Sequence, residues 1–409
     1  MKLPSIAFLR DNARWLAAGA LLMFSSSYGQ TFFISTFAGE IRAEFGLSHG
    51  EWGSIYGAGT LISATIMVWA GILTDHFRVR VLGSCVLAML ALASLAMSQV
   101  SAAWALIPVI LALRLAGQGM SSHIAATAMG RYFVATRGRA LSTVALGVSL
   151  GEASLPLIFA ALLTVFAWRD LWVVAALMAL LSIPALLALL REERTPQSAA
   201  QQSQSPGLNG RHWTRPQVLR SKLFWCIIPL ILGPPAFGTA LFFQQVHLAE
   251  VKGWPHVQFV ALFPLFTAVA VASMITTGIV LDRLGTHRLM PFYQLPMAVG
   301  FLILGGSDSL IVAAMGMALI GISNGANNTL STAFWAETYG TRHLGANRSM
   351  ATAIMVLGTA IGPFLTGALI DAGIPFDRQM PAIAVYFLLS SGLVWVGFKA
   401  LRRAPCPTA

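Results

Sequence analysis

Twelve apolar stretches of helical length follow one another along the chain, and this pattern restricts the possible fold more than any other feature. A helix rising 1.5 Å per residue needs roughly 20 apolar residues to cross a membrane. The stretches are residues 15–37, 51–73, 81–98, 103–130, 139–166, 170–190, 223–247, 257–280, 289–305, 310–336, 346–370 and 377–398. Charged residues make up only 10 % of the chain, against about 25 % in soluble domains. We therefore predict an all-α membrane protein with twelve transmembrane helices.

The sequence repeats at an offset of 207 residues. The loop GILTDHFRVR at 71–80 lies between two apolar stretches, and GIVLDRLGTHR at 278–288 lies between two others. The same offset pairs His49 with His256, Tyr132 with Tyr339, Gly138 with Gly345, Gly151 with Gly358, Pro156 with Pro363 and Asp170 with Asp377. Each copy spans the membrane an even number of times, so the copies run parallel. We expect two pseudo-symmetric six-helix halves, 1–191 and 222–409, joined by a flexible Gln-, Ser- and Pro-rich linker, 192–221.

Basic residues are distributed unequally between the two sides of this arrangement. With the N-terminus inside, 21 of the 26 Lys and Arg residues are cytoplasmic, and the outer loops hold only Arg42, Arg169, Lys252 and Arg378. This bias predicts that both termini and the linker are cytoplasmic. The net charge of +11 then indicates contact with anionic membrane lipid rather than nucleic acid. The first apolar stretch lacks a small-residue cleavage site, so we expect it to remain as the first span.

The two loops resemble the signature of the major facilitator superfamily, G-x-x-x-D-R-x-G-R-R/K, which joins that family's second and third helices. The second copy keeps Gly278, Asp282, Arg283, Gly285 and Arg288, and the first keeps Gly71, Asp75 and Arg80, with His76 and Arg78 where Arg and Gly are usual. The resemblance implies a monomeric secondary transporter of a bacterial inner membrane. It also implies alternating access, with these residues as the conformational motif.

Arg114 is the strongest candidate for substrate binding. It lies about eleven residues into the fourth stretch, roughly 16 Å deep, where a charge is costly and faces protein or a water-filled cavity. Gln118 lies one turn away on the same face. The run RLAGQG resembles the family's R-x-x-Q-G motif, with the glutamine one place later. A purely structural arginine that ties helices together is the alternative.

Glu152 is the one acid that we place deep within a stretch, roughly 20 Å along the fifth helix. Its repeat partner is Thr359, so the charge breaks the internal symmetry. The surrounding G-x-x-x-G-E-x-x-x-P resembles the family's antiporter motif, which usually has Gly-Pro where this chain has Gly151-Glu152. We predict a proton-coupling role for Glu152. A static ion pair with Arg114 is an equal alternative, and sodium coupling and the direction of transport stay open.

Polar stripes mark two further spans. Ser27, Thr31 and Ser35 recur every four residues in the first span beside Tyr28 and Gln30, and the tenth span carries Asn324, Asn327 and Asn328. In the family that the chain resembles, the first, fourth, seventh and tenth helices line the central cavity. Tyr28, Gln30, Thr31 and the three asparagines are therefore substrate-binding candidates, with helix-to-helix hydrogen bonding as the alternative. Pro234-Pro235 should break the seventh helix and form a gate, and we expect His123 to serve packing.

Other classes of function fit less well. GVSLG at 147–151 and GISNG at 321–325 match the hydrolase pattern G-x-S-x-G, but they lie in helical stretches, where close glycine packing is expected. No Walker A motif occurs, and Cys85, Cys226 and Cys406 form no CxxC pair, so we expect no enzyme activity, disulfide, metal or cofactor. We predict a proton-coupled transporter of a small organic anion, similar to the monocarboxylate and oxalate–formate branch. The alternatives are efflux of bulky apolar compounds and a non-transporting membrane receptor.

Overall fold

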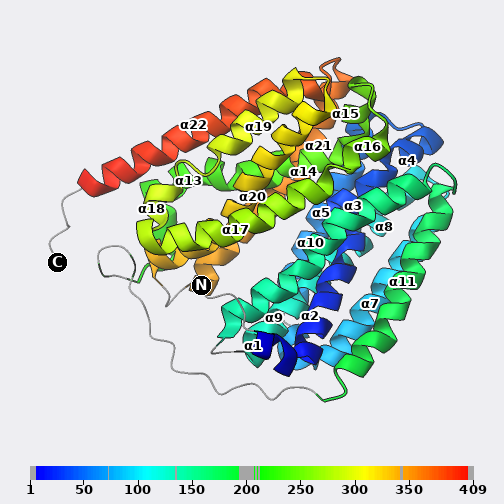
Figure 1. Ribbon diagram of the computed structural model, residues 1–409, viewed down its shortest axis with the longest axis horizontal. Helices are drawn as coiled ribbons and strands as arrows, with labels where there is room; N and C mark the ends of the chain where they lie inside the picture. The colour runs from blue at the N-terminus through cyan, green and yellow to red at the C-terminus, as the bar shows by residue number, and fades with distance from the viewer. Residues whose placement is uncertain are drawn as a thin grey trace.

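The computed structural model describes residues 6–71, 73–133, 136–192, 207, 210, 212–340 and 344–403, and throughout these it is built from helices and their connections (Figure 1). The first part of the chain forms α1 (Ile6–Asp11), α2 (Ala13–Ser25), η1 (Ser26–Gly29), α3 (Thr31–Ile34), η2 (Ser35–Phe37), α4 (Ala38–Phe45), α5 (His49–Ala70), α6 (Leu73–His76), α7 (Val79–Ser98), η3 (Ala103–Ala105), α8 (Leu106–Leu113), η4 (Arg114–Ser121), α9 (Ser122–Tyr132), α10 (Arg137–Leu162) and α11 (Trp168–Leu189). We call it the N half.

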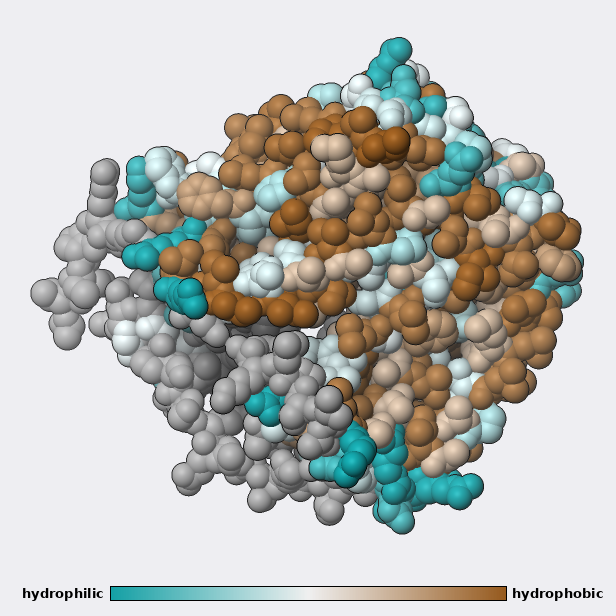
Figure 2. All heavy atoms as spheres, in the orientation of Figure 1, coloured by the Kyte–Doolittle hydropathy of each residue, from teal (hydrophilic) through white to brown (hydrophobic). Residues whose placement is uncertain are grey.

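The C half begins with α12 (Arg215–Arg220). It continues with α13 (Lys222–Gly233), η7 (Pro234–Gly238), α14 (Thr239–Phe243), α15 (Gln245–Val251), α16 (His256–Val260), α17 (Phe263–Leu284), α18 (Thr286–Leu289), α19 (Leu295–Gly306), α20 (Leu310–Tyr339), α21 (Leu344–Asp371) and α22 (Phe376–Arg403). Nine helices of the described chain are long and apolar enough to cross a membrane, and Leu295–Gly306 is a shorter apolar helix. Apolar side chains cover most of the visible face, with hydrophilic ones gathered at its edges (Figure 2). The chain is thus a multi-pass membrane protein.

Helix boundaries recur at the offset found in the sequence. α5 begins at His49 and α16 at His256, and α9 ends at Tyr132 where α20 ends at Tyr339. α7 and α18, and likewise α10 and α21, also begin 207 residues apart. The hydroxyl of Ser35 donates to the carbonyl oxygen of Phe242 at 2.6 Å. Because these two residues are themselves 207 apart, the contact lies where the axis relating the halves must pass.

The two halves meet at one end of the molecule and spread apart toward the other (Figure 1). At the closed end, near α4, α15 and α16, Asp371 accepts hydrogen bonds from the Ser48 hydroxyl at 2.7 Å and from the His49 and Gly50 amides at 3.0 and 2.7 Å. The rings of His49 and His247 lie 4.4 Å apart. These contacts cap the first turn of α5 with a carboxylate from the opposite half. The open end lies near α1 and α18.

Close packing of glycines explains the two G-x-S-x-G matches. A Cβ on Gly147 would collide with the carbonyl oxygen of Ala20, and one on Gly325 would collide with that of Ala270. Ser323 accepts a hydrogen bond from the Met297 amide at 2.9 Å in the middle of a helix bundle. The motifs therefore hold helices together, as predicted, and form no strand-to-helix elbow.

The first apolar stretch differs from the continuous span that we expected. Residues 15–37 divide among α2, η1, α3 and η2, and the chain is extended at Gln30, between η1 and α3, with φ −86° and ψ 154°. Serine hydroxyls there satisfy backbone carbonyls, as Ser26 does at Met23 (2.6 Å).

The expected break at Pro234-Pro235 is also wrong. The prolines lie in the π-helical turn η7, and the span Lys222–Phe243 continues through it. Proline removes a backbone donor and its ring crowds the preceding turn, and a widened turn accommodates both effects.

Two further boundaries need correction. The ninth span, expected at 289–305, becomes α18, a turn and α19, with Pro291 and Pro296 beside the interruption. The end of the expected flexible linker is ordered, since Thr214 and Gln217 form a capping box on α12. Trp213 packs on the Tyr339 ring at 5.8 Å, and its amide donates to the Tyr339 carbonyl. Residues 193–206 lie outside the described part.

Candidate functional site

The centre of the site is a close approach between η1, in the first apolar stretch, and η4, in the fourth. A Cβ on Gly29 would collide with the carbonyl oxygen of Leu113, and one on Gly117 would lie 2.6 Å from the Gly29 Cα. Only glycine permits this contact. The chain on one side is the 3₁₀ turn η1, and on the other it is the π-helical segment η4. Both crossings are therefore distorted at the same level.

Arg114 begins η4 and is buried, with 1 % of its surface exposed. Its Nη1 donates to the Gly29 carbonyl oxygen at 3.2 Å and to the Thr31 hydroxyl at 3.4 Å. The guanidinium carbon lies 5.4 Å from the Tyr56 ring centroid. The Tyr56 hydroxyl also shares a hydrogen bond with Thr31. Within the described chain Arg114 makes no ion pair, and its buried Nε has no acceptor.

The π-helical turn accounts for the departure from R-x-x-Q-G. A turn closed by i→i+5 hydrogen bonds holds one more residue than an α-turn. The additional residue between Arg114 and Gln118 falls within this turn. Such turns occur often at functional sites. Gln118 is half-buried, and no side-chain hydrogen bond joins it to a described residue.

Glu152 lies at the contact between the two halves. The Thr267 hydroxyl of α17 donates to its Oε2 at 3.3 Å. The neighbouring Gly151 packs on the Ser27 side chain. No ion pair links Glu152 to Arg114 among the described residues, so the static pair considered from sequence is not formed here. The carboxyl group instead contacts the opposite half of the molecule.

The other predicted substrate-binding residues are not all brought to Arg114. Thr31 touches it, and Gln30 and Asn324 are half-buried, with no side-chain hydrogen bond to a described residue. The Tyr28 hydroxyl faces Met178 Sδ at 3.5 Å, inside the N half. Asn327 accepts hydrogen bonds from Tyr293, in the turn before α19, and from Ser331 of its own helix, at 3.0 and 2.8 Å. Asn328 is exposed.

The conformational motif differs between its copies. A Cβ on Gly71 would lie 3.4 Å from His123 Nε2, which places His123 in packing as expected, whereas no described atom lies within 4 Å of the equivalent position at Gly278. Gly285 has φ +74°, and Glu337 accepts a hydrogen bond from the next amide, Thr286, at 3.0 Å. Arg80, Arg283 and Arg288 are exposed. The side chains of Asp75 and Asp282 lie outside the described part.

Sequence reasoning missed Tyr56, Thr267 and Glu337. Tyr56 and Thr267 are polar residues inside apolar stretches, the signal that selected Thr31, but neither belongs to a stripe. Glu337 follows the tenth stretch and looks like an ordinary end-of-helix acid. Only the folded chain brings it to Gly285. The described residues contain no cluster of His, Cys, Asp or Glu that would hold a metal ion.

Comparisons with known proteins agree with this architecture. No curated protein sequence matches the chain. A bacterial homolog of the human lysosomal transporter Spinster, inward-facing and occupied, superposes with TM-score 0.76 and 14 % identity over 98 % of this chain and 99 % of that chain. Its unoccupied inward-facing form gives 0.74 and 15 % over 97 % and 99 %. A mutant of the nucleoside transporter NupG gives 0.71 and 13 % over 95 % and 99 %.

These identities establish a shared fold and nothing about substrate. The family model described as Major Facilitator Superfamily matches residues 19–363, which is most of the chain. The helix-by-helix repeat and the loop motifs fall within that match. This chain belongs to the Major Facilitator Superfamily of secondary transporters.

Proposed function

We propose that this transporter moves a small organic anion, of the monocarboxylate kind, together with a proton across a bacterial inner membrane. The observation that carries the proposal is Arg114, a buried guanidinium that has no carboxylate partner among the described residues. Burying an unpaired charge costs several kcal/mol. An anionic substrate would supply the missing counter-charge, and the planar guanidinium suits a carboxylate held by two hydrogen bonds.

The surroundings of Arg114 favour a small anion. The Arg114 Nη1 donates to the Gly29 carbonyl oxygen and the Thr31 hydroxyl, while its buried Nε has no acceptor in the described part of the chain. The half-buried amides of Gln118 and Gln30 have no partner in the described chain and are available to a polar ligand. Part of the fork is thus fixed in position and part is free, as expected for a preorganised carboxylate site.

Glu152 supplies the proposed coupling. It lies at the boundary between the halves, where its only described hydrogen bond is to Thr267 of the opposite half. A protonated carboxyl group can cross the membrane with the moving site at lower electrostatic cost than a carboxylate. The anion and the proton would then travel together in a nearly neutral complex. Both termini and the open end would face the cytoplasm, in agreement with the distribution of basic residues.

Counterflow in proteoliposomes with a panel of radiolabelled monocarboxylates tests the proposal. Arg114→Ala should lower uptake by about 100-fold or more, the usual effect of removing one partner of a buried charged contact. Arg114→Lys should lose nearly as much, because an ammonium group cannot replace the planar fork. Arg378→Ala is the matched control, since it removes one exposed positive charge near the closed end. Normal monocarboxylate transport by folded Arg114→Ala would refute the anion site.

Efflux of bulky apolar compounds is the second candidate. It is favoured by the bond from Arg114 to the Gly29 carbonyl oxygen, which is what a purely structural arginine would make. This function predicts that Arg114→Ala weakens folding but leaves substrate choice unchanged. Counterflow with lipophilic dyes on the same variants separates the two functions. If the protein is an anion transporter, Arg114→Lys should lose organic-acid uptake while its thermal stability is kept.

A further inference from the structure

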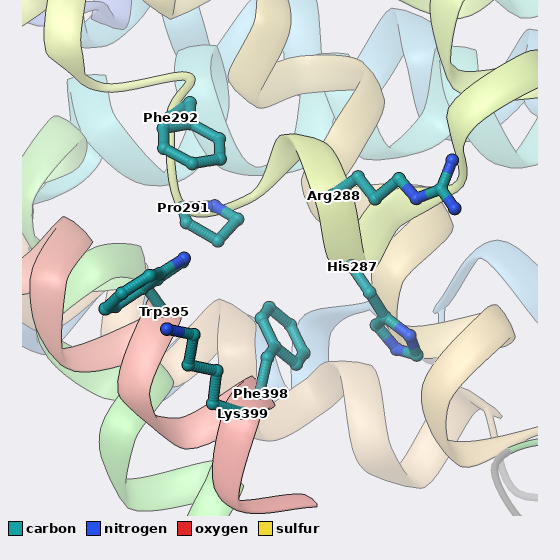
Figure 3. A pocket seen from close by; sticks show the side chains of 7 residues that line it. All are labelled: His287, Arg288, Pro291, Phe292, Trp395, Phe398 and Lys399. Atoms are coloured by element: carbon teal, nitrogen blue, oxygen red, sulfur yellow. The ribbon is translucent and has the colours of Figure 1, made fainter. Parts of the chain in front are cut away.

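A pocket of about 330 Å³ lies at the open end of the C half, away from Arg114 and Glu152. It is bounded by the last turns of α22 and by the turn that joins α18 to α19 (Figure 3). Trp395 and Lys399 lie side by side on α22 and face Phe292 across the pocket (Figure 3). Arg288 lines it from the α18 side, and its guanidinium points away from Trp395 (Figure 3).

The charge of the pocket is positive and unbalanced. No acid is among the residues that line it, and Lys399 makes no ion pair with a described residue. The Lys399 ammonium lies 3.4 Å from the centroid of the Trp395 ring, so the indole holds it in place by a cation–π contact. An anion entering the pocket would therefore meet a fixed positive charge.

The floor of the pocket is rigid. His287 is held by a hydrogen bond between its Nε2 and the Thr338 hydroxyl at 3.1 Å. Its ring packs on Phe398 with centroids 4.8 Å apart. Phe398 is buried. The pocket is thus built on α18, α20 and α22 together rather than on one surface side chain.

The walls of the pocket continue into the apolar surface of the membrane span. Phe292 and Trp395 are 54 % and 45 % exposed, and α22 also exposes Leu388, Leu389 and Val396. Such a surface faces acyl chains, while Lys399 at its edge reaches the level of the headgroups. A ligand that carries a negative charge above two apolar chains matches both features.

We propose that this pocket binds an anionic phospholipid, with its phosphate at Lys399 and its acyl chains against Phe292, Trp395 and the outer face of α22. The positive charge, the absence of an acid in the lining and the continuous apolar wall favour a lipid over a soluble anion. Arg288 adds a second basic residue to the lining from the α18 side. The proposal is independent of the transported substrate.

Native mass spectrometry of the purified full-length protein tests the site. The protein is titrated with phosphatidylglycerol, with phosphatidylcholine of the same chains, and with inorganic phosphate. We expect phosphatidylglycerol to bind in preference to phosphatidylcholine. Lys399→Gln should weaken this binding about fivefold, the usual effect of one basic residue at an anionic membrane surface. Lys399→Arg should retain it.

Arg220→Gln is the matched control, because Arg220 is an exposed basic residue on α12 at the same end of the molecule. It should leave the bound phosphatidylglycerol unchanged. An equal loss in Lys399→Gln and Arg220→Gln would overturn the proposal in favour of diffuse surface charge. Equal binding of the two lipids, or equally effective binding of inorganic phosphate alone, would also overturn it.

Discussion

The fourth transmembrane stretch of the N half and helix α20 of the C half occupy equivalent places in the repeat, but they have different roles. Arg114 corresponds to Gly321 at the offset of 207. In the N half this position opens a π-helical segment and carries a buried charge. In the C half it lies in an uninterrupted helix, where a Cβ on Gly321 would come within 2.7 Å of the Phe266 carbonyl oxygen. One copy of the position carries a charge, and the other brings two helices together.

The fifth and eleventh crossings differ in the same way. Glu152 corresponds to Thr359, whose hydroxyl donates to the Val356 carbonyl oxygen of its own helix at 2.8 Å. Glu152 instead contacts Thr267 of the opposite half. At the motif loop it is the C half that carries the distinctive residues. Gly285 and Glu337 correspond to Arg78 and Gly130 of the N half. The residues proposed to act thus stand at positions where the two copies of the repeat differ.

The sharpest way to break this comparison is to remove the asymmetric acid. Glu152→Gln mimics the protonated carboxyl group, so we expect exchange of labelled substrate across the membrane to continue while accumulation against a gradient falls to background. The measurement is uptake into proteoliposomes with an imposed pH gradient. Thr359→Val, at the equivalent position, should still accumulate substrate. Accumulation by Glu152→Gln would leave Glu152 with a structural role only.

A second prediction concerns the close approach of the two distorted crossings. Gly29→Ala places a methyl group against the Leu113 carbonyl oxygen, and overpacking of this kind costs about 2 kcal/mol. We expect a lower unfolding temperature in detergent. Gly392→Ala on α22, where a new Cβ would have no described atom within 4 Å, should leave the unfolding temperature unchanged or slightly higher. Equal stability of the two variants would mean that η1 and η4 separate without cost.

Much of the fold could be predicted from sequence. The lengths of the apolar stretches predict membrane spans, and the constant spacing of repeated residues predicts two similar halves. The predicted start at 51 lies two residues after the first residue of α5, and the predicted start at 310 is the first residue of α20. The site was harder to predict. Arg114 was found because charge in an apolar stretch is rare, whereas the distortion at Gln30 depends on Gly29 meeting Gly117, 88 residues away in sequence. Contacts of that range leave no local pattern, and for the same reason the partner of Glu152 could not be named.

The closed end offers a last and smaller test of the comparison, because it pairs His49 of the N half with His247 of the C half. Burial, followed by the positive charge of Arg42 and by His247, lowers the pKa of His49 to about 4. When the closed end opens, water should restore an ordinary pKa of about 6.5. The open form therefore binds a proton between pH 6.5 and 4 that the closed form does not. Acidification through that window must favour opening.

We expect the ratio of outward-open to closed molecules to rise by up to about tenfold between pH 7.5 and 5.5. Spin labels at Ser101→Cys and Ser309→Cys, in a background with the natural cysteines replaced by serine, would report the separation of the halves at that end. His49→Asn should remove the share of the pH response that this residue supplies, and what is left would come from His247, whose pKa burial also lowers. His256, the equivalent residue of the C half, is itself half-buried, and its Nε2 has no hydrogen-bond partner in the described chain. His256→Asn should therefore keep the share of the response that His49 supplies. A response that survives His49→Asn but disappears in His256→Asn would contradict this prediction. It would mean that His256 of the C half, rather than His49 of the N half, takes up the proton.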